Sequence, residues 1–184
     1  MRAERDELIL WVGEKHSGKT TALADLVGLA RDEGFNVAGI LAPSLYRDGR
    51  LIGFDVLDLR DGTRAPLARR ETRADARAPF TFIDEGFRLG TAALSEEATE
   101  SADLIVVDEF GPLELSGRGW RSSVESLLAS DKPTVLLVVR RELVDAVRQM
   151  YADFRCRSIN AGDPGACEKV VGMLSCRRRL QRRN

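Results

Sequence analysis

Residues 13–20 of the chain are Gly13-Glu14-Lys15-His16-Ser17-Gly18-Lys19-Thr20, which fits the pattern G-x-x-x-x-G-K-[ST]. In this pattern successive backbone N–H groups curl around a phosphate, and glycine is needed where a side chain would clash. The apolar run from Leu8 to Val12 precedes it and is typical of a buried parallel strand. Residues 19–33 carry apolar side chains at helical spacing, and Gly34 supplies a helix stop. A strand, this loop and a helix in that order predict a phosphate-binding loop.

The loop predicts how a nucleoside triphosphate is held. The N-terminus of the helix would place partial positive charge under the phosphates. Lys19 can reach the β- and γ-phosphate oxygens, and the Thr20 hydroxyl can hold Mg²⁺. His16 is the single histidine of the chain, and we assign it no acid or base role. The expected nucleotide-binding residues are Gly13, Glu14, Lys15, His16, Ser17, Gly18, Lys19, Thr20 and Thr21.

Two acidic residues follow the apolar run from Leu104 to Val107. Ligands of open α/β sheets bind at the carboxyl ends of the strands, so Asp108 and Glu109 are expected beside the phosphate-binding loop. Asp108 suits coordination of Mg²⁺ through water, and Glu109 can polarise an attacking water. The alternative is a solvated strand end, but the phosphate-binding loop upstream favours the catalytic interpretation.

The rest of the chain alternates between strand and helix patterns. Strands are expected at 36–41, 104–107, 134–139 and 156–159, and helices near 90–101, 120–129, 143–150 and 164–174. This alternation predicts an α/β fold with a mainly parallel sheet covered by helices on both faces. A length of 184 residues suits a single domain, residues 1–184.

Residues 40–68 interrupt this alternation with short extended pieces. The dipeptides Asp48-Gly49 and Asp61-Gly62 separate these pieces, and both residue types tolerate the left-handed backbone of hairpin turns. We therefore expect an antiparallel β-insertion after the second strand. Residues 69–79 are rich in arginine and poor in apolar side chains, which favours a solvated loop, with a lid over the substrate as the alternative.

Composition excludes several classes of protein. The chain has 28 basic and 29 acidic residues, so no overall field marks it for nucleic acid or for a membrane. The basic run from Arg177 to Arg183 is more typical of a solvated helix end than of a nucleic-acid site. The spacing of Cys156, Cys167 and Cys176 suggests neither a disulfide framework nor a zinc site. With no export signal at the N-terminus, we expect a cytoplasmic protein that contacts no membrane.

Three segments together resemble a known family. They are residues 13–21, residues 48–55 with Leu67 and Ala68, and residues 107–114, followed by residues 135–141 as a further strand with a basic end. In these segments the chain resembles the small P-loop nucleoside triphosphatases of the thermophile and cancer-related type. The resemblance implies a RecA-like P-loop NTPase sheet with a β-insertion and Mg²⁺-dependent hydrolysis of several nucleoside triphosphates with weak base preference. It also implies phosphate and metal roles for Lys19 and Thr20, a metal role for Asp108 and a water-activating role for Glu109.

Arg140 and Arg141 follow the apolar run that ends at Val139. They should emerge at the same sheet edge as Asp108, where one of them could sense the γ-phosphate or act across a subunit interface. The alternative is a pair of solvated arginines that open the next helix.

Three functions remain open at this point. The leading one is a hydrolase for ATP, GTP and other nucleoside triphosphates, free-standing, self-associating or coupled to a client protein. A small-molecule or nucleotide kinase would share the loop and use residues 69–77 as a lid. A nucleotide-dependent assembly module would switch shape at residues 110–113. Glu109 favours hydrolysis, because a kinase keeps water away from the phosphate and needs no water-polarising acid there.

Overall fold

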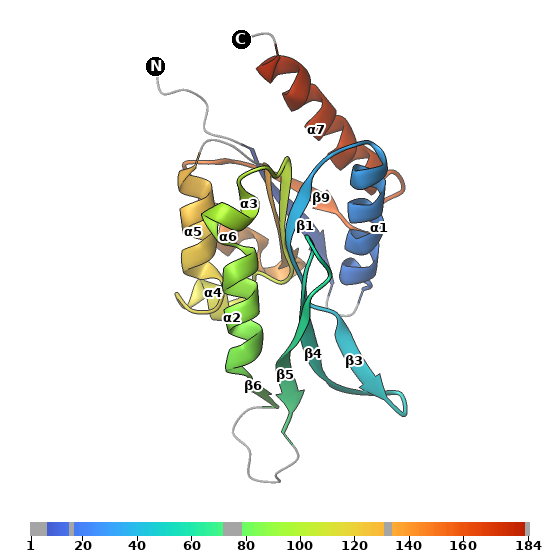
Figure 1. Cartoon of the computed structure of the whole chain (residues 1–184), viewed down its shortest axis with the longest axis vertical. Coiled ribbons are helices and arrows are strands. Elements are labelled where there is room, and N and C mark those ends of the chain that lie inside the picture. The colour runs from blue at the N-terminus through green and yellow to red at the C-terminus, as the bar shows by residue number, and fades with distance from the viewer. Residues whose placement is uncertain (1–6, 15–16, 72–78, 131–133, 183–184) are drawn as a thin grey trace.

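The computed structural model describes residues 7–14, 17–71, 79–130 and 134–182. Within these residues nine strands form a single sheet in the order β6-β5-β4-β2-β7-β8-β1-β9, with β3 paired to β4 (Figure 1). The strands are β1 (Glu7–Gly13), β2 (Val37–Leu41), β3 (Ser44–Arg47), β4 (Arg50–Asp58), β5 (Arg64–Arg70), β6 (Phe80–Phe82), β7 (Leu104–Val107), β8 (Thr134–Arg140) and β9 (Arg155–Asn160).

The sheet has a parallel half and an antiparallel half. Strands β2, β7, β8, β1 and β9 pair in parallel, whereas β4 runs antiparallel to β2, and β3, β5 and β6 continue the antiparallel pairing. The predicted insertion is therefore confirmed as an antiparallel extension of the main sheet. Figure 1 shows its strands reaching beyond the N-terminal end of α1 (Lys19–Asp32).

Helices cover both faces of the parallel half, as the sequence predicted. The longer helices are α1, α2 (Asp84–Ala93), α5 (Arg121–Ala129), α6 (Val144–Met150) and α7 (Ala166–Gln181). Alternate residues of β1 show the two layers. Leu8 and Leu10 pack with α2, α5 and α6, and Ile9 and Trp11 pack with α1 and α7. Because both faces are buried, the central strands are apolar throughout.

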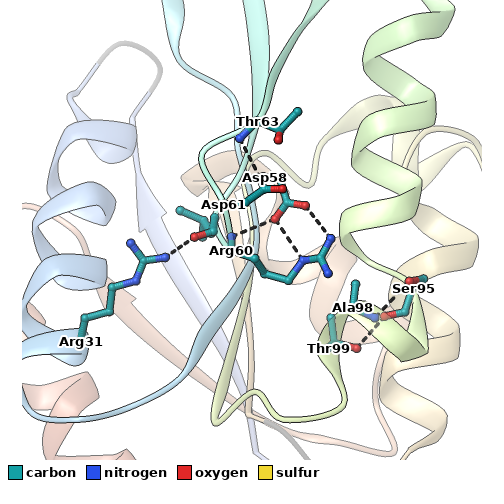
Figure 2. Close-up of polar contacts among 9 residues, drawn as sticks. Arg31, Asp58, Arg60, Asp61, Thr63, Ser95, Ala98 and Thr99 are labelled. Atoms are coloured by element: carbon teal, nitrogen blue, oxygen red, sulfur yellow. Dashed lines mark hydrogen bonds and ion pairs between the residues drawn. The ribbon is translucent and has the colours of Figure 1, made fainter.

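The turn between β4 and β5 is closed by Asp58, Asp61 and Thr63 (Figure 2). The buried Asp58 carboxylate accepts hydrogen bonds from the backbone N–H of Arg60 at 2.9 Å and from its guanidinium at 2.8 Å. The Asp61 carboxylate accepts a hydrogen bond from the Thr63 N–H at 2.8 Å, and Gly62 adopts a φ of 78°. The other expected turn has Asp48 at φ 50° and Gly49 at φ 73°. Both hairpin predictions are therefore confirmed.

The expected helix at 90–101 is wrong in its bounds. The chain forms α2 from Asp84 and, after a break, a short α3 (Glu96–Thr99). The Ser95 hydroxyl accepts a hydrogen bond from the Ala98 N–H at 3.2 Å, which caps α3 (Figure 2). Asp84 and Glu85 lie in the first turn of α2, where acidic residues stabilise a helix.

The expected loop at 69–79 is also wrong at its start, since β5 continues through Arg69 and Arg70. The Arg69 guanidinium donates to the carbonyl of Phe54 at 2.8 Å and pairs with Asp55 at 2.7 Å, which ties it to β4. Phe80 then begins β6. The remainder of that prediction, residues 72–78, lies outside the described residues.

The C-terminal helix is longer than predicted and reaches Gln181. The Arg178 guanidinium lies 3.9 Å from the centroid of the Phe35 ring and pairs with Asp103 at 3.0 Å. These contacts hold one residue of the basic run against the domain. Two short helices, α4 (Pro112–Leu115) and the 3₁₀ turn η1 (Arg141–Leu143), complete the elements. Over the described ranges, every helix is too short or too polar to cross a lipid bilayer.

The close approach of β2 and β7 generates a prediction about Gly39. This residue has a φ of 104°, and an added Cβ would lie 2.1 Å from the Val106 carbonyl oxygen. Gly39→Ala should therefore lower the free energy of unfolding by about 3 kcal/mol or more, from backbone strain and overlap together. Urea denaturation followed by circular dichroism measures the change.

Gly28→Ala is the matched control, because a Cβ on this helical glycine meets no atom within 4 Å. It should raise stability by about 0.5–1 kcal/mol, since alanine loses less backbone entropy in a helix. A Gly39→Ala protein as stable as the parent would contradict the close packing of β2 on β7.

Candidate active site

The phosphate-binding loop lies between buried β1 and the first turn of α1. A Cβ on Gly13 would stand 2.8 Å from the Ser17 Oγ and 2.9 Å from the Lys19 Cγ, so any larger residue would displace these two side chains. Gly18 caps α1 with a φ of 80°, a conformation that favours glycine. The two glycines of the motif are thus required for different reasons. Lys15 and His16 lie outside the described residues.

Lys19 is largely buried, with 8% of its surface exposed. Its Nζ donates a hydrogen bond to the Glu14 carbonyl at 2.5 Å, across the mouth of the loop. Its own carbonyl accepts from the indole N–H of Trp11 at 3.4 Å. These contacts hold the ammonium group at the loop, where the terminal phosphates of a nucleotide would meet it.

Asp108 follows β7 and is 2% exposed. Its Oδ2 accepts a hydrogen bond from the Ala42 N–H at 3.1 Å, just after β2. Burial raises the pKa of Asp108 to about 6, although hydrogen bonds from the Ala42 N–H and the Thr20 hydroxyl act in the opposite direction. A buried carboxylate beside a threonine hydroxyl fits a divalent cation, whose charge would offset the desolvation.

A preformed cage of ligands is absent from the described part of the chain, which holds no cluster of three or more His, Cys, Asp or Glu side chains suited to a metal. The Asp108 carboxylate and the Thr20 hydroxyl are the groups that could hold a divalent cation here.

Glu109 and Arg140 form an ion pair, with 2.6 Å between the Arg140 Nε and the Glu109 Oε1. The angles are poor for a hydrogen bond, and Oε1 accepts none from the described residues, so we describe the contact as electrostatic. The side chains of Arg140 and Glu109 are 27% and 35% exposed, and both line the same cavity as Lys19 and Asp108. The structure thus joins the two residues that the sequence had suggested for water activation and phosphate sensing.

Arg141 points elsewhere. Its Nε lies 2.7 Å from the Glu14 Oε1, and both side chains are more than half exposed. Glu14 therefore links the phosphate-binding loop to the end of β8 through its side chain and to Lys19 through its carbonyl. Of the two arginines, Arg140 is the one that lines the cavity.

Glu114 has a role that the sequence analysis did not assign. It is 4% exposed, and its two carboxylate oxygens accept hydrogen bonds from the N–H groups of Gly111 at 2.8 Å and Trp120 at 3.2 Å. Burial raises the pKa of this carboxyl group. Glu114 is the third residue of α4 and its carboxylate reaches back to the N–H of the N-cap Gly111, but glycine has no side chain to complete a capping box, so no sequence pattern indicated this role.

One continuous cavity of about 790 Å³ connects these groups with the β-insertion. At its phosphate end lie Ser17, Gly18, Lys19, Thr20, Thr21, Asp108, Glu109 and Arg140. At its other end lie aromatic side chains of β3, β4, β6 and α2, together with Trp120. No sequence pattern indicated this aromatic end, because its residues are spread over separate elements.

The chain is similar in sequence to several known proteins. A nucleoside-triphosphatase THEP1 of Methanopyrus kandleri is 32% identical over 135 residues, covering 72% of this chain and 73% of that protein. Those of Methanothermobacter thermautotrophicus and Thermococcus kodakarensis are 34% and 33% identical, over 73% and 77% of this chain and 78% and 81% of theirs.

A solved structure shows the same fold. The solution structure of a human cancer-related nucleoside triphosphatase superposes with a TM-score of 0.68, covering 93% of this chain and 97% of its own at 21% identity. The sequence model of the NTPase family matches residues 9–161, which include the phosphate-binding loop, the β-insertion and the acidic strand end. The chain therefore belongs to the NTPase family.

Proposed function

We propose that this chain hydrolyses nucleoside triphosphates to the diphosphate and phosphate in a Mg²⁺-dependent reaction with broad base preference. Hydrolysis is the activity that its family membership supports. The observation that carries the proposed mechanism is the meeting of the phosphate-binding loop, Asp108 and the Glu109–Arg140 pair in one cavity.

Lys19, Thr20 and Asp108 are proposed to bind the triphosphate and its metal. The Lys19 Nζ would exchange its contact with the Glu14 carbonyl for oxygens of the β- and γ-phosphates. Thr20 and Asp108 would hold Mg²⁺, which neutralises phosphate charge when bound. The Ala42 N–H fixes the Asp108 carboxylate so that it stays at the sheet edge.

Glu109 is proposed to orient and polarise the attacking water. Its side chain is partly exposed and lines the same cavity as the phosphate-binding loop, where a water attacking the γ-phosphate would lie. Arg140 is proposed as the phosphate sensor. Its guanidinium pairs with Glu109, and a γ-phosphate would compete for the same cation.

Steady-state phosphate release over ATP, GTP, CTP and UTP tests the proposed function. We expect turnover of all four with Mg²⁺ and loss of turnover when EDTA removes the metal, because Lys19 and Arg140 alone cannot neutralise the phosphates. Release that requires an added acceptor molecule would instead indicate a kinase. Release that is unchanged in EDTA would overturn the metal role.

Glu109→Gln should bind MgNTP like the parent and lose about 10²- to 10⁴-fold in kcat. Glutamine keeps the size of the side chain and lacks the charge that polarises water. Titration with a non-hydrolysable analogue measures binding, and phosphate release measures kcat. Glu168→Gln is the control, since Glu168 is exposed on α7 and does not line the cavity. Near-parental turnover of Glu109→Gln would refute its role as the base.

Arg140→Ala should lower kcat by about 10²-fold, because it removes a cation from the γ-phosphate. Arg141→Ala is the neighbouring comparison, and it should change kcat much less, since Arg141 braces Glu14 outside the cavity. Equal losses in the two variants would contradict the assignment of the sensor to Arg140 alone.

A further inference from the structure

The cavity extends well beyond what a triphosphate chain needs, and its far end is built from aromatic rings. The rings belong to Tyr46, Phe54, Phe80, Phe82, Phe87 and Trp120. Five of them contact one another in two groups, Phe54 with Phe80, and Phe82 with Phe87 and Trp120. Phe54 lies 5.3 Å from Phe80, Phe82 lies 5.5 Å from Phe87, and Phe87 lies 5.1 Å from Trp120, measured between ring centroids. We call this set the aromatic wall.

The aromatic wall begins close to the metal-binding carboxylate. The Ala42 N–H contacts Asp108, and Ser44 follows two residues later and pairs with Phe54 across β3 and β4. The Pro43 carbonyl accepts a hydrogen bond from the Asp55 N–H at 3.1 Å, which fixes the start of β3 against β4. A ligand anchored at Lys19 and Thr20 can therefore reach Phe54 without leaving the cavity.

Part of this apolar surface is open to solvent. Tyr46 is 59% exposed and Phe82 is 51% exposed, and these two are among the few exposed large apolar side chains in the described ranges. Trp120, in contrast, is 3% exposed and fits against Gly90, where a Cβ would lie 2.3 Å from its ring. The wall thus combines a buried, fixed ring at Trp120 with exposed rings at Tyr46 and Phe82, which suits a flat apolar group.

Several polar groups near the wall are already engaged. Both Glu114 oxygens accept backbone N–H groups, and the Ser116 hydroxyl donates to the Leu113 carbonyl at 2.7 Å. These groups are poorly placed to distinguish one base edge from another, whereas ring faces accept any base. A stacking surface with little hydrogen-bond readout would bind all nucleobases with similar affinity.

We propose that the aromatic wall is the nucleobase site, and that Tyr46 and Phe54 of the β-insertion stack on the base of the bound triphosphate. The proposal rests on the proposed function, since it places the base of the same nucleotide whose phosphates lie at Lys19. Under this proposal the β-insertion binds the nucleobase, and its ring faces allow the site to accept several bases. Because purines offer a larger face than pyrimidines, the affinity for purine nucleotides should depend more strongly on the aromatic wall.

Calorimetric titration of the full chain tests the site with two ligands. One is a non-hydrolysable ATP analogue with Mg²⁺, and the other is inorganic tripolyphosphate with Mg²⁺, which has no base. Tyr46→Ala and Phe54→Leu should each lower the affinity for the ATP analogue by about tenfold and leave the affinity for tripolyphosphate unchanged. Tyr46→Phe keeps the ring and should bind like the parent. Leu180→Ala, which removes an equally exposed apolar side chain on α7, is the matched control.

Several outcomes would overturn the proposal. Unchanged affinity of the analogue in both variants would show that the base lies elsewhere. An equal loss of affinity for the analogue and for tripolyphosphate would show that the wall only supports the phosphate-binding loop. Tyr46 is exposed, so Tyr46→Ala remains a valid test even if Phe54→Leu fails to fold. Phosphate release by the parent is measured separately, so a failure of hydrolysis is distinguished from a failure of the base site.

Discussion

The buried carboxylate of Asp108 is the constraint on which the site depends. A charge removed from water is costly unless other groups compensate it, and Asp108 is almost completely enclosed. Its compensation comes from three places: the Ala42 N–H after β2, the Thr20 hydroxyl in α1, and the cation that the site is proposed to hold. The first two tie the end of β2 and the start of α1 to the end of β7. The position of one carboxylate therefore couples the insertion, the phosphate-binding loop and the acidic strand end.

The sheet explains why these elements can meet. Strands β1, β8, β7 and β2 lie side by side and run in parallel, so the residues that come after them collect at a single edge. The antiparallel strand β4 adds to β2 at Ile40 and Leu41, and the chain leaves Leu41 directly for Ala42. The insertion thus begins directly beside the site. This arrangement lets aromatic side chains of β3, β4 and β6 share a cavity with the phosphate-binding loop.

Sequence patterns predicted the parts that depend on local chemistry, such as the loop at 13–20 and the two hairpin turns. The start of α2 was missed because Gly86 and Gly90 weaken its helical pattern. A Cβ on either glycine would overlap β5 or Trp120, which is a tertiary reason that no local pattern contains. The ion pair of Glu109 with Arg140 depends on β7 and β8 being neighbours, and a sequence pattern does not fix strand order. The aromatic wall likewise depends on the register of β4, β5 and β6, which aligns single aromatic residues from separate strands.

The charges at the phosphate end impose an order on the steps after nucleotide binding. Lys19 and Arg140 balance Asp108 and Glu109, and Glu109 is tied to Arg140. A triphosphate brings about four negative charges, of which a divalent cation offsets about two. The remaining negative charge attracts Lys19 and Arg140. When Arg140 turns toward a γ-phosphate, its ion pair with Glu109 weakens. A carboxylate released in this way can accept a hydrogen bond from water. In the proposed mechanism the base therefore becomes free only when a γ-phosphate is present, so water is activated only in the presence of the substrate that it attacks.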